Sequence, residues 1–198
     1  MKRGVYFFIK RVFDLCVSIV ALPFFAIIYV VVAIAIKMED GGPVFYMAER
    51  IGKDCKKLRM YKFRSMKVNA ENILNADGST YNAKDDPRVT KVGKFLRETS
   101  LDETAQLLNI LKGEMSLIGP RASGWDALPT YKEDEMDKMK VLPGITGYTQ
   151  AYYRNGISVR EKRLYDAWYA NHASLWLDTK IFFKTIVTVL KRENVYTN

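Results

Sequence analysis

The longest continuous pattern in the chain is an apolar run from Val12 to Ile36, with Pro23 in its middle. A run of this length reaches the roughly 20 residues that an α-helix needs to cross the hydrocarbon core of a bilayer. It is also longer than the apolar region of a signal peptide. Proline inside a helix removes a backbone hydrogen bond and kinks the helix. The pattern therefore predicts a membrane helix that is bent or broken near Pro23.

Basic residues flank this run on both sides: Lys2, Arg3, Lys10 and Arg11 before it, and Lys37, Arg50, Lys53, Lys56 and Lys57 after it. The positive-inside tendency draws both flanks to the cytoplasmic face, which a single crossing cannot satisfy. A re-entrant segment that enters and leaves on one side therefore competes with a spanning helix, and these residues alone leave both open. In the re-entrant case, we expect Asp14 at headgroup depth, paired with Lys10 or Arg11.

Two short strands are predicted after the membrane segment, at residues 44–47 and 57–64. In the second strand, the apolar positions change face after Met60. This phase change predicts a β-bulge that redirects Lys62 and Arg64. A solvated edge strand protected by its lysines explains the same residues.

Three later segments have helical patterns. Residues 101–111 form one that ends at Gly113, and residues 134–140 predict a charged helix with a solvated face. Residues 175–192 set apolar side chains against basic ones, which suits a membrane interface, although packing on a core explains them about as well. With a glycine-rich turn at 143–147, these patterns predict a helix-rich α+β fold with short strands and no extended sheet.

Composition narrows the function classes. A chain of 198 residues that is 48% hydrophobic supports one domain plus a short appendage. Its net charge of +9 implies an anionic partner, which is nucleic acid, acidic lipid or a phosphorylated small molecule. Two distant cysteines and a single histidine indicate neither a disulfide framework nor a zinc site, and they exclude a histidine triad within this chain.

Two adjacent carboxylates, Asp102 and Glu103, lie at the predicted start of a helix. Ser100 is a suitable N-cap and Glu103 falls where a capping-box glutamate reaches back to it, so helix initiation explains Glu103. Asp102 has no capping role. A helix N-terminus stabilises a negative charge by roughly 0.3–1 kcal/mol and attracts phosphate. An ionised Asp102 is therefore a candidate nucleophile, and Arg121, after a Gly-Pro turn, is a candidate phosphate ligand.

Five motifs, read in order, resemble the small monotopic phosphoglycosyl transferases of the bacterial sugar transferase family. They are Tyr61-Lys62-Phe63-Arg64-Ser65-Met66, Ser100-Leu101-Asp102-Glu103, Leu111-Lys112-Gly113-Glu114-Met115-Ser116, Gly119-Pro120-Arg121 and Pro143-Gly144-Ile145-Thr146-Gly147. The match covers nearly the whole chain, including the broken apolar segment.

The resemblance implies transfer of a phospho-sugar from a nucleotide diphosphate sugar, typically a UDP-sugar, to undecaprenyl phosphate, with release of UMP. By motif, Asp102 is the nucleophile that forms a phosphosugar-aspartyl intermediate, and Glu103 is its partner, engaged with Mg²⁺. The positions that match phosphate-binding residues of the family are Lys62, Arg97, Arg121 and Arg154. Asp166 and Asp178 match less securely. This is the first membrane step of a surface glycan pathway, such as that of capsule, O-antigen, exopolysaccharide or a glycoprotein glycan.

The resemblance also implies an architecture and a location. Residues 1–37 form a re-entrant helix-break-helix segment, and residues 38–198 form a cytosolic catalytic domain with a small β-hairpin and amphipathic interfacial helices. The expected location is the cytoplasmic face of the bacterial inner membrane. The expected partners are the nucleotide-sugar donor, polyprenyl phosphate and membrane phospholipid, without nucleic acid, and a homodimer stays open.

The chain departs from the family pattern at several positions. Thr104-Ala105 stand where Leu-Pro is usual, Ala122 replaces a proline, Leu22 replaces a polar residue before the membrane proline, and Tyr148-Thr149-Gln150 replace Trp-Ala-Gln. None of these is a carboxylate or a basic position of the motifs. The departures therefore concern the substrate pocket and the helix break more than the reaction.

Two other function classes compete with transfer. A membrane-tethered module that binds anionic lipid or nucleic acid explains the net charge, but it gives Asp102 and Glu103 no role. A membrane-anchored hydrolase could use the two carboxylates as an acid/base pair, but adjacent helical residues point about 100° apart and cannot readily flank one bond.

Overall fold

The computed structural model describes residues 3–71, 73, 81, 83, 85–154 and 156–191. Its α-helices are α1 (Arg3–Asp40), α2 (Lys91–Thr99), α3 (Leu107–Lys112), α4 (Tyr148–Tyr152), α5 (Val159–His172) and α6 (Leu175–Lys191). Its strands are β1 (Phe45–Ile51), β2 (Lys57–Phe63), β3 (Ser116–Ile118) and β4 (Gly144–Thr146). The described residues also form the 3₁₀ segments η1 (Lys53–Cys55), η2 (Leu101–Gln106), η3 (Trp125–Thr130) and η4 (Glu133–Lys140). The predicted helix-rich α+β class is confirmed.

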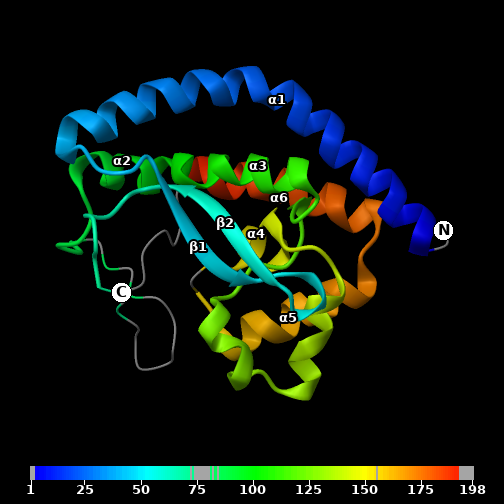
Figure 1. The fold of residues 1–198 in the computed structure, drawn as a ribbon. Coiled ribbons are helices and arrows are strands. Elements are labelled where there is room, and N and C mark those ends of the chain that lie inside the picture. Colours follow the sequence, from blue (N-terminus) through cyan, green and yellow to red (C-terminus); the bar gives the residue numbers. More distant parts are fainter. Residues whose placement is uncertain are drawn as a thin grey trace.

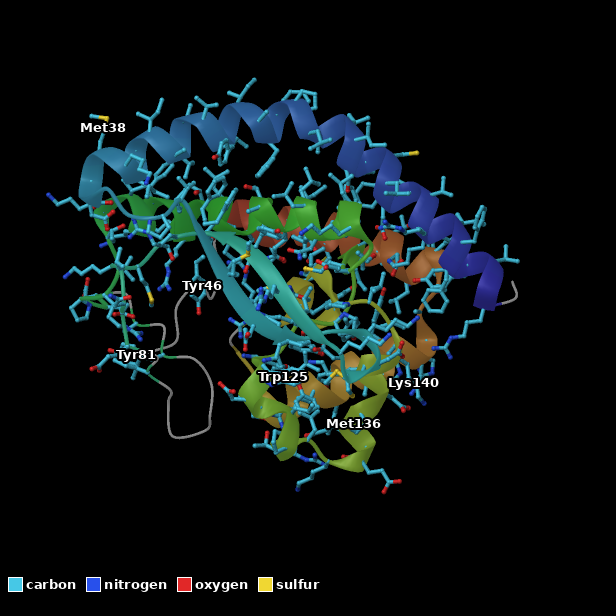
Figure 2. All side chains as sticks on the ribbon, viewed as in Figure 1. Met38, Tyr46, Tyr81, Trp125, Met136 and Lys140 are labelled. Carbon is cyan, nitrogen blue, oxygen red and sulfur yellow. The ribbon has the colours of Figure 1, made fainter. Side chains whose placement is uncertain are left out.

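Helix α1 is a continuous helix of 38 residues that passes through Pro23 and arches over the rest of the molecule (Figure 1). Its bend replaces the expected break, and the helix continues past residue 37 to Asp40. Among the described residues, it is the helix whose length and apolar composition suffice to cross a membrane. Large apolar side chains, such as Phe24 and Ile27, cover its outer face, where Figure 2 shows Met38 projecting away from the domain.

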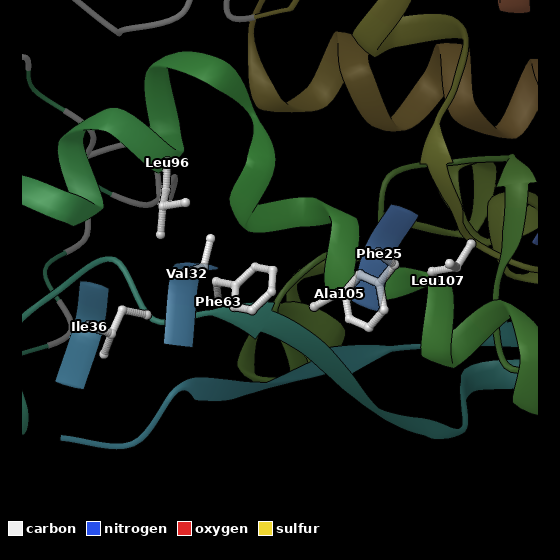
Figure 3. Packing of buried hydrophobic residues seen from close by; sticks show 7 residues of the cluster. All are labelled: Phe25, Val32, Ile36, Phe63, Leu96, Ala105 and Leu107. Carbon is white, nitrogen blue, oxygen red and sulfur yellow. The ribbon is translucent and has the colours of Figure 1, made fainter. Parts of the chain in front are cut away.

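The inner face of α1 is part of the hydrophobic core. Phe25, Val32 and Ile36 pack with Phe63 of β2 and Leu96 of α2 in one buried cluster (Figure 3). Burying side chains of this size contributes about 1.5–3 kcal/mol each. Apolar side chains therefore lie on both faces of α1. Those on the inner face pack on the domain, and those on the outer face are exposed.

Asp14 differs from the prediction. It is buried and accepts a hydrogen bond from the backbone N–H of Leu117 at 3.0 Å. Lys10 instead forms an ion pair with Asp178 at 2.6 Å, and Arg11 donates to the last carbonyls of α3. The expected pairing of Asp14 at headgroup depth is wrong, because the backbone of β3 provides a partner that only the tertiary structure brings close.

Strands β1 and β2 form an antiparallel hairpin whose register runs without interruption from Phe45↔Phe63 to Ile51↔Lys57. The predicted bulge after Met60 is therefore wrong. The two faces of the hairpin are buried at different places: Met60 packs with Ile110 and Met115, whereas Phe63 packs beneath α1. The apolar pattern changes face because the covering elements change, while the strand stays regular.

Strands β3 and β4 form a second, parallel pair in which Ser116 lies opposite Gly144. The predicted turn at 143–147 is thus partly a strand. A Cβ atom on Gly144 would lie 2.1 Å from the backbone nitrogen of Gly119, and one on Gly147 would lie 2.0 Å from the Gly119 oxygen. The glycines of these two motifs allow the backbones to approach each other closely.

Helix α6 matches the predicted helix at 175–192 closely. Ile181 is buried in the core, but Trp176, Phe183 and Ile186 are exposed. In Figure 1, α6 lies with α2 and α3 below the arch of α1. The exposed aromatic and aliphatic side chains fit the interfacial prediction for this helix better than packing on the core.

Candidate active site

The two carboxylates lie in η2, immediately after α2. Ser100 adopts the left-handed conformation (φ 57°) and ends α2, with its N–H directed to the Arg97 carbonyl at 3.2 Å. Its side chain caps nothing in η2. The predicted N-cap and capping box are therefore wrong. A left-handed residue closes the preceding helix, and Asp102 and Glu103 follow in a 3₁₀ turn.

Lys62 reaches this turn from β2. Its Nζ lies 2.8 Å from Glu103 Oε1 and 3.7 Å from Asp102 Oδ2. The regular pairing of β2 with β1 fixes the position of Lys62 in the strand, and both carboxylates meet this one ammonium group. A cation shared by two adjacent carboxylates reduces their mutual repulsion.

Arg121 approaches Glu103 from the other side. Its Nη2 lies 3.2 Å from Glu103 Oε1, and its side chain is 54% exposed. Its backbone carbonyl accepts a hydrogen bond from Lys138 at 3.0 Å, and Lys138 pairs with Asp166 at 3.1 Å. The buried ion pair of Lys138 and Asp166 thus holds the backbone that presents Arg121.

Lys138 is a residue that the sequence interpretation missed. The segment 134–140 was predicted to be a helix with a solvated face, but η4 buries Glu135, Lys138 and Met139. The predicted solvated face is present at Glu133, Asp134 and Lys140. The buried face was missed because its carboxylate and guanidinium partners come from α5, where Asp166 and Arg160 lie. No local pattern distinguishes a paired buried lysine from a solvated one.

The two carboxylates have opposite electrostatic environments. Burial raises the pKa of Asp102, while Lys62 lowers it and Glu103 raises it further. The resulting pKa lies above the ordinary value, which is opposite to the direction expected from a helix N-terminus. Burial also raises the pKa of Glu103, but Lys62 and Arg121 lower it more, so that it lies well below its ordinary value.

The two carboxylates also differ in the number of hydrogen bonds that they accept. Glu103 accepts hydrogen bonds from Lys62 and Arg121, whereas Asp102 accepts none from a described residue. Glu103 therefore anchors the two cations, and Asp102 keeps its oxygen atoms available for an incoming group.

The remaining predicted residues are Arg97, Arg154 and Asp178, and each has contacts of its own. The positive charge of Arg97 lowers the pKa of Asp102, and its Nε donates to Ser65 Oγ at 3.1 Å. Arg154 has a left-handed backbone (φ 48°), and its N–H donates to the Thr149 carbonyl. Its phosphate-binding role stays a prediction. Asp178 accepts hydrogen bonds from Tyr6, Lys10 and Tyr169, and so fastens α1 to the domain.

A magnesium ion fits this donor set. The described residues contain no group of three or more metal-ligating side chains. Mg²⁺, however, is usually held by one or two carboxylates together with the phosphates of a substrate. Asp102 and Glu103 supply two adjacent carboxylates, so a phosphorylated substrate would complete the coordination.

Comparisons with known proteins find similar sequences over most of the chain. The family model described as bacterial sugar transferase matches residues 5–192. The UDP-galactose-lipid carrier transferase of Erwinia amylovora is 40% identical over 202 residues, which cover 96% of this chain and 42% of that protein. The undecaprenyl-phosphate galactose phosphotransferase of Salmonella typhimurium is 38% identical over 200 residues, with the same two coverages.

A shorter relative is covered almost completely. The exopolysaccharide production protein ExoY of Rhizobium meliloti is 37% identical over 198 residues, which cover 94% of this chain and 88% of that protein. The chain therefore spans about two fifths of the length of the first two relatives and most of the length of the third.

Proposed function

Since the chain belongs to the bacterial sugar transferase family, we propose that it transfers a phospho-sugar from a UDP-sugar to undecaprenyl phosphate and releases UMP. The observation that carries the proposal is the pair in η2. Asp102 is buried beside Lys62 and accepts no hydrogen bond from the described residues, whereas Glu103 forms ion pairs with two cations. The names of the relatives support the acceptor and a role in exopolysaccharide synthesis.

The reaction has two displacements. In the first, an Asp102 oxygen attacks the phosphorus attached to the sugar, and the bond from this phosphorus to the bridging oxygen breaks, so that the electron pair leaves with UMP. In the second, a phosphate oxygen of undecaprenyl phosphate attacks the same phosphorus and releases the Asp102 carboxylate. Covalent catalysis allows the soluble donor and the lipid acceptor to use the site in turn.

The basic residues supply charge neutralisation. Lys62, beside both carboxylates, and Arg121, beside Glu103, face the place where phosphate oxygens gain charge in the transition state. Asp102 and Glu103 would hold Mg²⁺, which neutralises phosphate charge when it is bound. Glu103 keeps Lys62 and Arg121 in position before the donor arrives.

The attachment of α1 supports a monotopic arrangement, in which both ends of the helix lie on one side of the membrane. The cytoplasmic face of the inner membrane is the side that we propose. Near its start, Lys10 pairs with Asp178, and at its end, Asp40 pairs with Arg64. A straight helix of 38 residues is about 57 Å long, which exceeds the roughly 30 Å hydrocarbon core. A helix that crossed the bilayer would carry its two ends to opposite sides, whereas both ends here are fastened to one domain.

Trapping of the intermediate tests the proposal. Wild-type protein in detergent, mixed with donor labelled in the sugar and Mg²⁺ but without acceptor, should retain label on the protein and release one equivalent of UMP. Asp102→Asn should do neither, because an amide cannot displace UMP. Asp126→Asn, at an exposed surface position, is the matched control and should behave as wild type.

Two outcomes would contradict the proposal. Free phospho-sugar without any labelled protein would indicate a hydrolase. The membrane-tethered binding module would be indicated if wild type released UMP from no nucleotide sugar and Asp102→Asn bound anionic lipid vesicles or nucleic acid as tightly as wild type.

A further inference from the structure

Arg50 lies beside the site at the far end of the hairpin. It is paired with Leu58 in the register of β1 and β2 and forms an isolated bridge with Gly124. The N–H of Ile51 donates to the Ser123 carbonyl at 2.9 Å, and a Cβ on Gly124 would lie 3.5 Å from Arg50 Nη1. The end of β1 is therefore fixed against the segment that follows Arg121.

Arg50 and Lys62 share one face of the hairpin. Residues opposite each other in an antiparallel pair point to the same side, and side chains two apart in a strand do so too. The pairs Arg50↔Leu58 and Tyr46↔Lys62 therefore place both cations on the same side. Arg59 lies on the opposite side, where its side chain is exposed.

The Arg50 side chain has no counter-ion among the described residues. Its Nε is buried without a hydrogen-bond acceptor, and neither of its terminal nitrogens forms an ion pair within the described part of the chain. Burial lowers the pKa of the guanidinium and Arg121 lowers it further, whereas Tyr46 and Glu103 raise it. The fully buried Lys138, by contrast, has a carboxylate partner in Asp166.

Arg50 is half-buried, and its buried Nε is costly, because desolvation removes water from this N–H without replacing its hydrogen bond. The cost is recovered when an anionic ligand binds. Arg121 touches Glu103 and acts electrostatically on Arg50, so the cations follow the order Lys62, Arg121, Arg50 away from Asp102. Two adjacent phosphoryl groups would fit such a row.

The direction of the row identifies which phosphate reaches Arg50. Phe63, next to Lys62, packs beneath the membrane helix α1. The Arg50 end of the hairpin lies farther from α1, near the labelled Trp125 (Figure 2). Lys57, at this end of β2, places its ammonium group over the Trp125 ring. The acceptor phosphate comes from the bilayer, whereas the nucleotide comes from the aqueous side.

We propose that Arg50, together with Arg121, binds the phosphate that leaves with the nucleotide, while Lys62 faces the phosphoryl group that Asp102 attacks. The inference rests on the proposed function and deepens it. Bonds from the Arg50 guanidinium to the departing phosphate stabilise the charge that develops there as the diphosphate bond breaks. They also set affinity for the nucleotide product.

The test compares Arg50→Met and Arg50→Lys with the control Arg59→Met, all in detergent. Calorimetric titration with UMP should show affinity reduced about 10-fold or more in Arg50→Met, because charge-assisted hydrogen bonds to phosphate are lost. Arg50→Lys should lie between wild type and Arg50→Met. The KM for the donor should rise in parallel, the KM for undecaprenyl phosphate should stay constant, and Arg59→Met should match wild type throughout.

Thermal unfolding separates binding from folding. Arg50→Met should unfold at or above the wild-type temperature, because the buried Nε loses no partner. Wild-type UMP affinity in Arg50→Met, or a raised KM for the acceptor alone, would overturn the inference while leaving the proposed function intact. If wild type neither releases UMP from the donor nor traps the phospho-sugar, the proposed function itself fails.

Discussion

Asp102 is held in an unfavourable environment for a charged side chain. It is 9% exposed, and burial raises its pKa above the ordinary value of 3.8. Its neighbour Glu103 has the favourable ion pairs. Such a division is typical of a functional pair, in which one group stabilises the site and the other is kept reactive. The stability of the protein should reflect this division.

Asp102→Asn should raise the thermal midpoint at pH 7 while abolishing UMP release, because the amide carries no charge that burial destabilises. A carboxyl with a raised pKa binds more protons when folded, so ionised Asp102 lowers stability above its folded pKa. The gain should shrink as the pH falls through that pKa and vanish below 3.8. Thermal scans between pH 3 and 8 would measure this, and a constant gain at all pH values would contradict it.

The residue scale also shows what sequence could and could not provide. The motif resemblance predicted that Lys62, Arg121, Asp102 and Glu103 belong to one active site. The structure places these four residues together. The local role of Ser100 was misjudged, because the same residue that caps a helix start can also end the preceding helix in a left-handed conformation. Sequence spacing does not decide between these two roles.

At the scale of elements, most helix and strand positions could be predicted from periodicity, but their surroundings could not. The hairpin has the predicted strands without the bulge, because two different clusters bury its two faces. The predicted turn at 143–147 pairs with β3 as a strand. Parallel pairing between two short strands that are distant in sequence produces no periodic pattern in either segment. Only the glycines indicated that the two backbones approach each other closely.

Gly144→Ala should destabilise the protein by about 1–3 kcal/mol or more, as overpacking does. Its Cβ would lie 2.1 Å from backbone of Gly119, which cannot yield as a flexible side chain would. Gly4→Ala is the control, since a Cβ there meets nothing within 4 Å and alanine favours the helix. Thermal unfolding would check both variants, and equal midpoints would refute the close-packing account.

At the scale of the whole molecule, α1 and the domain form one body. The core cluster of Phe25, Val32 and Ile36 includes Phe63 of the hairpin, and the domain holds both ends of the helix through ion pairs. Sequence could not decide between a spanning and a re-entrant helix, because that choice depends on contacts between residues more than 100 positions apart.

A monotopic arrangement makes a direct prediction for labelling in cells. In a background with Cys16→Ser and Cys55→Ser, single cysteines at Gly4→Cys and Met38→Cys should react with a membrane-impermeant maleimide only after the cytoplasmic side is made accessible. Both ends of α1 remain with the domain, so both should behave like Cys55 in a control that carries Cys16→Ser alone. Labelling of one end from outside intact cells would instead establish a spanning helix.

The pairing of Lys10 with Asp178 joins residues 168 positions apart. At a synthesis rate of roughly 5–20 residues per second, on the order of 10–30 s separates the emergence of the two partners from the ribosome. During that interval, Tyr6 and Lys10 of α1 lack the Asp178 carboxylate that they contact in the folded protein. Helix α6, which is made after α1, therefore completes the docking of α1.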